Sequence, residues 1–136
     1  MWEFNAWGGD VLPSWESDRR IGRFVAGLAG ARVPASMDYT RKVILEGGAI
    51  DVDGEGTLIA TEESVLDANR WCSKDEGREG RRGAVESAVV ASLGVEKVVW
   101  LPWGVAGDVD TNGHVDNMCR FVGVGEVVLR ESLGRK

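Results

Sequence analysis

The sequence has few of the residues and patterns that mark a specialised class of protein. Two cysteines in 136 residues cannot build a disulfide framework, so a reducing, cytoplasmic setting is expected. No apolar run approaches the roughly 20 residues that cross a bilayer, and the first ten residues lack the basic start and apolar core of a signal peptide. A net charge of −6, with no cluster of Lys or Arg, argues against nucleic acid or an anionic membrane as a partner.

The pattern of apolar residues predicts an α/β chain of about one domain. Apolar positions at helical spacing predict helices at residues 14–29 and 84–93. Strands are expected at residues 2–7, at 41–52 with its centre at Val43–Leu45, and at 57–61 and 96–102, with a hairpin turn at "DGEG". The charged, glycine-rich stretch 67–83 is expected to be a loop. "HVDNMCRFVG" and "EVVLRE" are expected to form a last hairpin.

The two hairpins resemble each other, which suggests a repeated unit. "EGGAIDVDGEGTLIAT" can be laid over "NGHVDNMCRFVGVGEVVLRE" with Gly47 on Gly113 and Gly48 on His114. From Arg41 the order of elements is ββαβ and then ββ again. Repeated units bury each other's faces. We therefore expect one complete ββαβ unit at about residues 41–101, with parts of its neighbours, and a chain truncated at both ends.

The only histidine of the chain stands among carboxylates in "DTNGHVDNMC". If this stretch enters a strand, His114 and Asp116 share one face, and Cys119 points away from His114. That arrangement argues against a Cys–His nucleophile pair. Glu46 comes just before two glycines in the matching hairpin. If the repeats surround a common axis, Glu46, Asp110, His114 and Asp116 could converge.

Carboxylates beside an imidazole suit a guanidinium ligand, because paired carboxylates match its planar fork of donors. A histidine at such a site can exchange protons near neutral pH. Each residue also has a structural alternative: His114 as a partly buried histidine with satisfied hydrogen bonds, Asp110 as a turn cap, and Glu46 as a hairpin edge residue. Tryptophans, Trp7 included, are more often core residues than ligand walls. One histidine with scattered carboxylates disfavours a metal site, and no cofactor is expected.

Five stretches occur together and in order: "FNAWGG", "LEGGAIDVDGEGTLIATEE", "NR", "LGVEKVVWLP" and "GDVDTNGHVDNMC". In this combination the chain resembles the agmatine deiminases of plant and algal type, within the bacterial-type peptidylarginine deiminase (pentein) family. The likeness runs from Trp2 to about Leu129. It implies part of a five-bladed α/β propeller, the pentein fold, built from ββαβ units around a central site.

The resemblance also implies an activity, the hydrolysis of agmatine to N-carbamoylputrescine and ammonia in putrescine biosynthesis. In that family a cysteine attacks the guanidinium carbon. By the same resemblance, His114 is the general acid and base, and Glu46 holds the histidine or the guanidinium. Asp116 and Asp110 bind substrate, and Trp7 helps to wall the site.

The chain departs from the family pattern in ways that bear on activity. The family's nucleophilic cysteine lies in a Gly-rich His-Cys segment that this sequence lacks, and neither Cys72 nor Cys119 has that context. A Trp-x-Arg-Asp segment upstream of "FNAWGG" is also missing. We therefore expect the middle third of a deiminase, inactive on its own. A protein-arginine deiminase, a non-catalytic fragment that binds guanidinium ligands or a partner chain, and a homo-oligomer stay open as alternatives.

Overall fold

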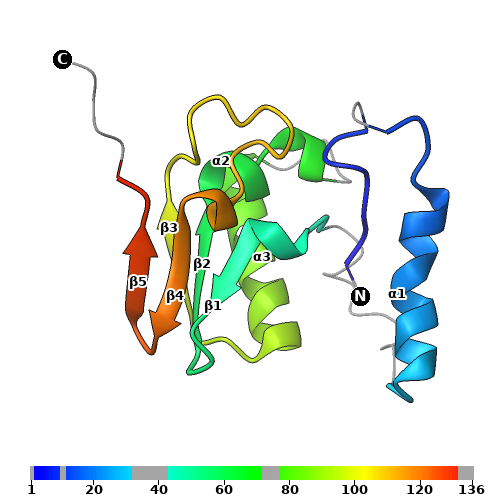
Figure 1. The fold of residues 1–136 in the computed structure, drawn as a ribbon, viewed down its shortest axis with the longest axis horizontal. Helices are drawn as coiled ribbons and strands as arrows, with labels where there is room; N and C mark the ends of the chain where they lie inside the picture. Colours follow the sequence, from blue (N-terminus) through cyan, green and yellow to red (C-terminus); the bar gives the residue numbers. More distant parts are fainter. Residues whose placement is uncertain (1, 10–11, 32–42, 72–76, 132–136) are drawn as a thin grey trace.

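The computed structural model describes residues 2–9, 12–31, 43–71 and 77–131 of the chain. These residues form an α/β structure, as the sequence predicts. A three-stranded sheet carries one long helix on one side, and a two-stranded hairpin lies on the other (Figure 1). No helix in the described stretches is long and apolar enough to cross a membrane.

The three-stranded sheet consists of β1 (Ile50–Val52), β2 (Thr57–Thr61) and β3 (Lys97–Leu101). β1 pairs antiparallel with β2, and β2 pairs parallel with β3. A parallel pair needs a long crossover, and α3 (Arg78–Leu93) supplies it. The predicted hairpin turn at "DGEG" is confirmed. Its two glycines have φ of 82° and 95°, a region that other residues rarely adopt.

β2 is buried on both of its faces, which explains its nearly continuous apolar sequence. Alternate side chains of a strand point to opposite faces, so the core is divided into two clusters. The cluster on the α3 side includes Leu58, Ala60, Val85, Ala88 and Val89. The cluster on the opposite side is Ile59, Val115 and Cys119, with partly buried neighbours. The second cluster joins the sheet to the segment that carries the histidine.

The prediction of a loop across residues 67–83, with a helix only from residue 84, is wrong. α3 already begins at Arg78. Its first turns carry charged side chains and glycines, none of them buried, so the apolar periodicity that marks a helix starts about two turns later. Arg78 and Arg82 instead tie this end of α3 to Glu62 of α2 (Glu62–Val65), with N–O distances of 3.3 and 3.1 Å.

The predicted helix at residues 14–29 is confirmed as α1 (Glu16–Leu28). None of its residues is buried in this chain. The predicted apolar face is between 53 and 75% exposed, at Ile21, Phe24, Val25 and Leu28. α1 stands apart from the sheet, at the right of Figure 1. Its apolar stripe therefore identifies a helix correctly without identifying what covers it.

The predicted strand at residues 2–7 is wrong, and the strand predicted at residues 41–52 forms only in its last three residues, as β1. Residues 2–7 and 43–45 are not strands. Each segment makes only isolated bridges, between Glu3 and Ile44 and between Val43 and Trp71. Residues 6–9 form a turn instead, in which Trp7 has a φ of 55°. The Glu3–Ile44 bridge nevertheless holds the N-terminal segment beside the residues that lead into Glu46 and η1.

The last hairpin consists of β4 (Cys119–Gly123) and β5 (Glu126–Leu129). The prediction that its first strand starts at His114 is wrong, because a 3₁₀ turn, η3 (Val115–Asn117), comes first. The β1–β2 hairpin is likewise preceded by a 3₁₀ turn, η1 (Gly47–Ala49). The likeness of the two hairpins thus extends to the turn that leads into each.

Candidate active site

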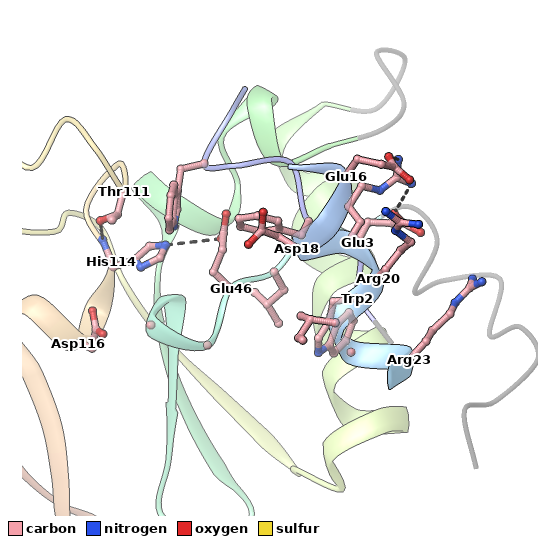
Figure 2. A pocket seen from close by; sticks show the side chains of 18 of the residues that line it. Trp2, Glu3, Glu16, Asp18, Arg20, Arg23, Glu46, Thr111, His114 and Asp116 are labelled. Carbon is pink, nitrogen blue, oxygen red and sulfur yellow. Dashed lines mark hydrogen bonds and ion pairs between the residues drawn. The ribbon is translucent and has the colours of Figure 1, made fainter. Parts of the chain in front are cut away.

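A cavity of about 820 Å³ lies between the N-terminal segment, α1, η1 and the turn before η3. Figure 2 shows Glu46, His114, Thr111 and Asp116 on one side of it, and Glu3, Glu16, Arg20 and Arg23 on the other. Its lining includes Trp2, Phe4, Trp7, Asp18, Leu45, Gly47, Gly48 and Asn117. Four of the five predicted site residues line it: Trp7, Glu46, His114 and Asp116.

Glu46 and His114 face each other as the residues that precede the two 3₁₀ turns. Both are buried, with 9% and 4% of their surface exposed. Glu46 Oε2 lies 3.5 Å from His114 Nε2, which is longer than a good hydrogen bond. Among the described residues neither atom has a hydrogen-bond partner. Catalytic hydrogen bonds are often long before substrate binds, so this pair has the geometry of an acid–base site at rest.

Arg70 does not line the cavity, but it is a third buried charged residue, in contact with Glu46. Sequence reasoning did not place it in the site. It ends the 3₁₀ turn η2 (Ala68–Arg70) and is 1% exposed. Its Nε donates to Glu46 Oε1 at 3.0 Å. The only signal for it in the sequence is "NR", one of the stretches that carry the family resemblance. Glu46 therefore bridges an arginine and the histidine.

The electrostatics of this wall favour an ionised Glu46. Burial alone would raise the pKa of its carboxyl, but the facing His114 imidazole and the Arg70 guanidinium outweigh burial and hold that pKa below its usual value. Glu46 is thus a buried carboxylate whose charge depends on its two neighbours.

Acid is expected to remove the stability that ionised Glu46 contributes. A lowered folded-state pKa means that the contribution is complete above the usual glutamate value of about 4.3. It is then lost as the pH falls through the lower folded-state value. Urea unfolding of the wild-type chain and Glu46→Gln, from about pH 6 to about pH 3, measures this. The wild-type midpoint should fall more steeply in the acid range, and equal slopes for the two chains would contradict the assignment.

Gly48 leaves the space in which Asp116 and His114 come together. A Cβ at this position would lie 2.6 Å from Asp116 Oδ2 and 2.8 Å from His114 Nδ1. The two side chains therefore meet over η1, although they do not share the face of a strand as predicted. The same Cβ at Gly47 would meet no atom within 4 Å, so only the second glycine is sterically required.

Gly48→Ala is expected to push Asp116 and His114 apart and to cost about 1–3 kcal/mol of unfolding free energy, the usual range for an overpacked site. Gly47→Ala is the matched control, with an expected change within about 0.5 kcal/mol. Urea unfolding of the two variants measures the difference. Equal stabilities would show that the wall can shift to admit the methyl group.

Asp110 is the one predicted site residue that the structure does not bring to the cavity. It is exposed and does not line the wall. Nor does the structure give it the turn-capping role, since Asp108 accepts hydrogen bonds from Thr111 N at 3.0 Å and Asn117 Nδ2 at 2.8 Å. Burial alone would raise the pKa of Asp108, but these bonds outweigh it and lower that pKa. The substrate-binding role of Asp110 stays a prediction.

The remaining candidates differ in their surroundings. Trp7 lines the cavity and packs edge-on against Phe4, with ring centroids 5.6 Å apart.

Cys119 is buried in the core beside β2, where burial raises the pKa of its thiol and the nearby Asp51 charge raises it further. A raised pKa disfavours a nucleophilic thiolate. Cys72 lies outside the described residues. Within the described stretches, no group of three or more His, Cys, Asp or Glu side chains is placed to hold a metal ion.

Comparison with known proteins places the chain in a family. The sequence model of the Porphyromonas-type peptidyl-arginine deiminases matches residues 1–135. The chain belongs to this family. It is 44% identical to the agmatine deiminase of Medicago truncatula over 133 residues, which are 94% of this chain and 32% of that protein. The agmatine deiminase of Pseudomonas fluorescens is also 44% identical, over 94% of this chain and 33% of its own length.

Solved structures of the peptidyl-arginine deiminase family share the fold. The agmatine deiminase of Enterococcus faecalis superposes with a TM-score of 0.78 at 34% identity, over 97% of this chain and 34% of that one. The chain thus spans about a third of the length of the relatives it matches.

Proposed function

We propose that the chain is the part of an agmatine deiminase that carries the acid–base histidine and guanidinium-binding carboxylates. The whole enzyme then hydrolyses agmatine to N-carbamoylputrescine and ammonia. The buried Glu46–His114 pair beside Asp116, on one wall of a cavity, carries this proposal. Two relatives that are 44% identical to this chain, over about a third of their own length, are agmatine deiminases. This supports agmatine as the substrate.

The reaction implied by the family resemblance has two halves. A cysteine thiolate attacks the guanidinium carbon, the bond from that carbon to one terminal nitrogen breaks, and ammonia leaves with an added proton. Water then attacks the same carbon, the carbon–sulfur bond breaks, and the ureido product leaves as the thiolate is regenerated. We assign the nucleophile to neither cysteine of this chain. Cys119 is a core residue with a raised pKa, and Cys72 lacks the family's His-Cys context.

The residues of this chain do the proton transfer and the positioning. His114 protonates the departing nitrogen and then takes a proton from the attacking water. Glu46 orients the imidazole across the 3.5 Å separation. Asp116 accepts charge-assisted hydrogen bonds from the guanidinium, Trp7 walls the site, and Asp110 is a second substrate-binding carboxylate.

We also propose that the whole protein is a cytoplasmic five-bladed α/β propeller. Two observations support the propeller: the ββαβ order from β1 to β3, and a second 3₁₀ turn and hairpin after it. The exposed apolar stripe of α1 is consistent with further units that cover it.

A segment exchange tests the function. The matching third of the Medicago truncatula agmatine deiminase is replaced by residues 1–136 of this chain, and this hybrid is called the exchange enzyme below. Ammonia and N-carbamoylputrescine are measured with agmatine as substrate. We expect both products in equal amounts from the exchange enzyme, and neither from the 136-residue chain alone. A folded exchange enzyme that makes neither product would contradict the proposal.

Peptidyl-arginine deiminase is the second candidate, favoured by the description of the matching family. Two thirds of the exchange enzyme come from an agmatine deiminase, so substrate choice by this chain needs a test of its own. Residue substitutions within this chain are therefore compared on agmatine and on an N-acylated arginine amide. If substitutions in this wall lower the activity on the acylated amide more than the activity on agmatine, the second candidate is favoured.

A further inference from the structure

Arg70 contacts Glu46 and also the turn that leads into His114. On one side it donates from Nε to Glu46 Oε1 at 3.0 Å. On the other side its Nη2 donates to the carbonyl of Thr111 at 3.0 Å, and its Nη1 donates to Asn112 Oδ1. Thr111 and Asn112 belong to the turn that leads into His114. The backbone N–H of His114 in turn donates to Thr111 Oγ1 at 3.3 Å.

The guanidinium of Arg70 is itself held rigidly. Nη1 also donates to Asn69 Oδ1 at 2.7 Å, and the amide of Asn69 donates to Asn112 Oδ1 at 3.1 Å. A planar fork of five donors matches such a ring of oxygens, whereas a lysine ammonium offers a single point of charge. Arg70 therefore fixes the relative position of Glu46 and the His114 turn, which lie far apart in the sequence.

Charge gives Arg70 a second effect on the pair. Glu46 is buried, and a buried carboxylate without a cation is strongly disfavoured. Arg70 faces it from η2, and His114 faces it from the start of η3. The charged residues that line the cavity beside the pair are of both signs: Glu3, Glu16, Asp18, Asp116, Arg19, Arg20 and Arg23. With Oε1 occupied by Arg70, the free Oε2 is the oxygen that faces His114 Nε2. An oxygen in that place favours the tautomer with the proton on Nε2, which leaves Nδ1 to accept a proton.

We propose that Arg70 is a positioning residue that, through Glu46 and the Thr111–Asn112 turn, fixes the orientation and the Nε2–H tautomer of His114. The catalytic meaning of this inference rests on the proposed deiminase function, but its structural content does not. The two are therefore tested separately.

The first test uses the 136-residue chain, because His114 is its only histidine. With ¹⁵N-labelled histidine, NMR shows a single imidazole. We expect a protonated Nε2 with an observable N–H proton, since that atom is buried. Arg70→Met should lose this signal and move the ring nitrogens toward the averaged shifts of a free imidazole. Arg70→Lys should weaken the signal, and Arg120→Met, on an exposed arginine of β4, should leave it unchanged.

A folded Arg70→Met chain with the wild-type imidazole spectrum would overturn the inference. Should Arg70→Met fail to fold, Arg70→Lys decides, because a lysine keeps the charge without the fork. A wild-type spectrum in that variant overturns the positioning role, and a weakened Nε2–H signal supports it.

The second test uses the exchange enzyme and concerns catalysis. Arg70→Lys should lower kcat on the order of 10- to 100-fold, the effect of misplacing a catalytic group, while KM for agmatine changes far less. A loss confined to KM would contradict positioning of His114. If the exchange enzyme is inactive with Arg70 intact, the proposed function fails, and the NMR result still decides the structural inference.

Discussion

His114→Asn in the exchange enzyme is expected to lower kcat by about two to four powers of ten, the usual contribution of a positioned acid–base residue. Asparagine retains a hydrogen-bonding side chain beside Glu46 but cannot take or give a proton. The ring of His114 is buried and faces Glu46 Oε2 at 3.5 Å, so no bulk water can replace it directly. Steady-state ammonia release measures the change.

The control for this prediction is Glu55→Gln, which removes an exposed carboxylate in the β1–β2 turn. Its kcat should stay within about twofold of the parent. A His114→Asn enzyme that is as active as the control would exclude His114 as the acid–base residue. Another group would then have to move the protons.

Arg70→Met is expected to reduce the unfolding free energy of the 136-residue chain by about 3–5 kcal/mol, because it breaks a buried ion pair from one side. The substitution leaves Glu46 buried beside an uncharged side chain, and it removes the hydrogen bonds of Arg70 to Asn69 Oδ1, Asn112 Oδ1 and the Thr111 carbonyl. Urea unfolding followed by tryptophan fluorescence measures the loss.

Two companion variants separate charge from packing. Arg120→Met removes an exposed arginine with a longer 3.7 Å ion pair to Asp51, and it should cost at most about 1 kcal/mol. Adding Glu46→Gln to Arg70→Met should recover part of the loss, since the uncompensated charge is then gone. A loss in Arg70→Met no larger than in Arg120→Met would show that the Glu46–Arg70 pair contributes little.

The sequence predicts which residues form the cavity wall better than it predicts the elements that carry them. Glu46, His114 and Asp116 do lie together, but a 3₁₀ turn brings the last two together and a strand does not. A strand and a 3₁₀ turn have different side-chain periods. A stretch as short as "GHVDN" contains too few residues for the pattern to distinguish them.

The sequence around Arg70 does not predict that this arginine is buried beside Glu46. Its partners are Glu46, Asn69, Thr111 and Asn112, and no regular spacing connects them. A buried arginine is recognised only when the fold has assembled the oxygens around it. The same holds for Asp108 and Asp110, two positions apart in one turn. The local sequence does not show that Asp108 makes the turn's hydrogen bonds while Asp110 is exposed.

The helices show a second limit of prediction from sequence patterns. α1 was predicted from its apolar stripe, and the stripe is exposed in this chain. Periodicity reports that a face needs cover, but not which surface covers it. The start of α3 was missed because ion pairs to Glu62, and not an apolar face, hold its first turns. In both helices, the local sequence pattern does not show which residues the helix contacts in the folded chain.

Agmatine saturation of the exchange enzyme carrying Asp116→Asn tests the central claim most directly, that the wall formed by Glu46, His114 and Asp116 is a guanidinium site. Losing a hydrogen bond to a charged group costs about 1.5–3 kcal/mol, so kcat/KM should fall roughly 10- to 150-fold. Glu55→Gln should stay near the parent value. An Asp116→Asn enzyme with the kcat/KM of the parent would show that agmatine does not use this wall, and would contradict the account.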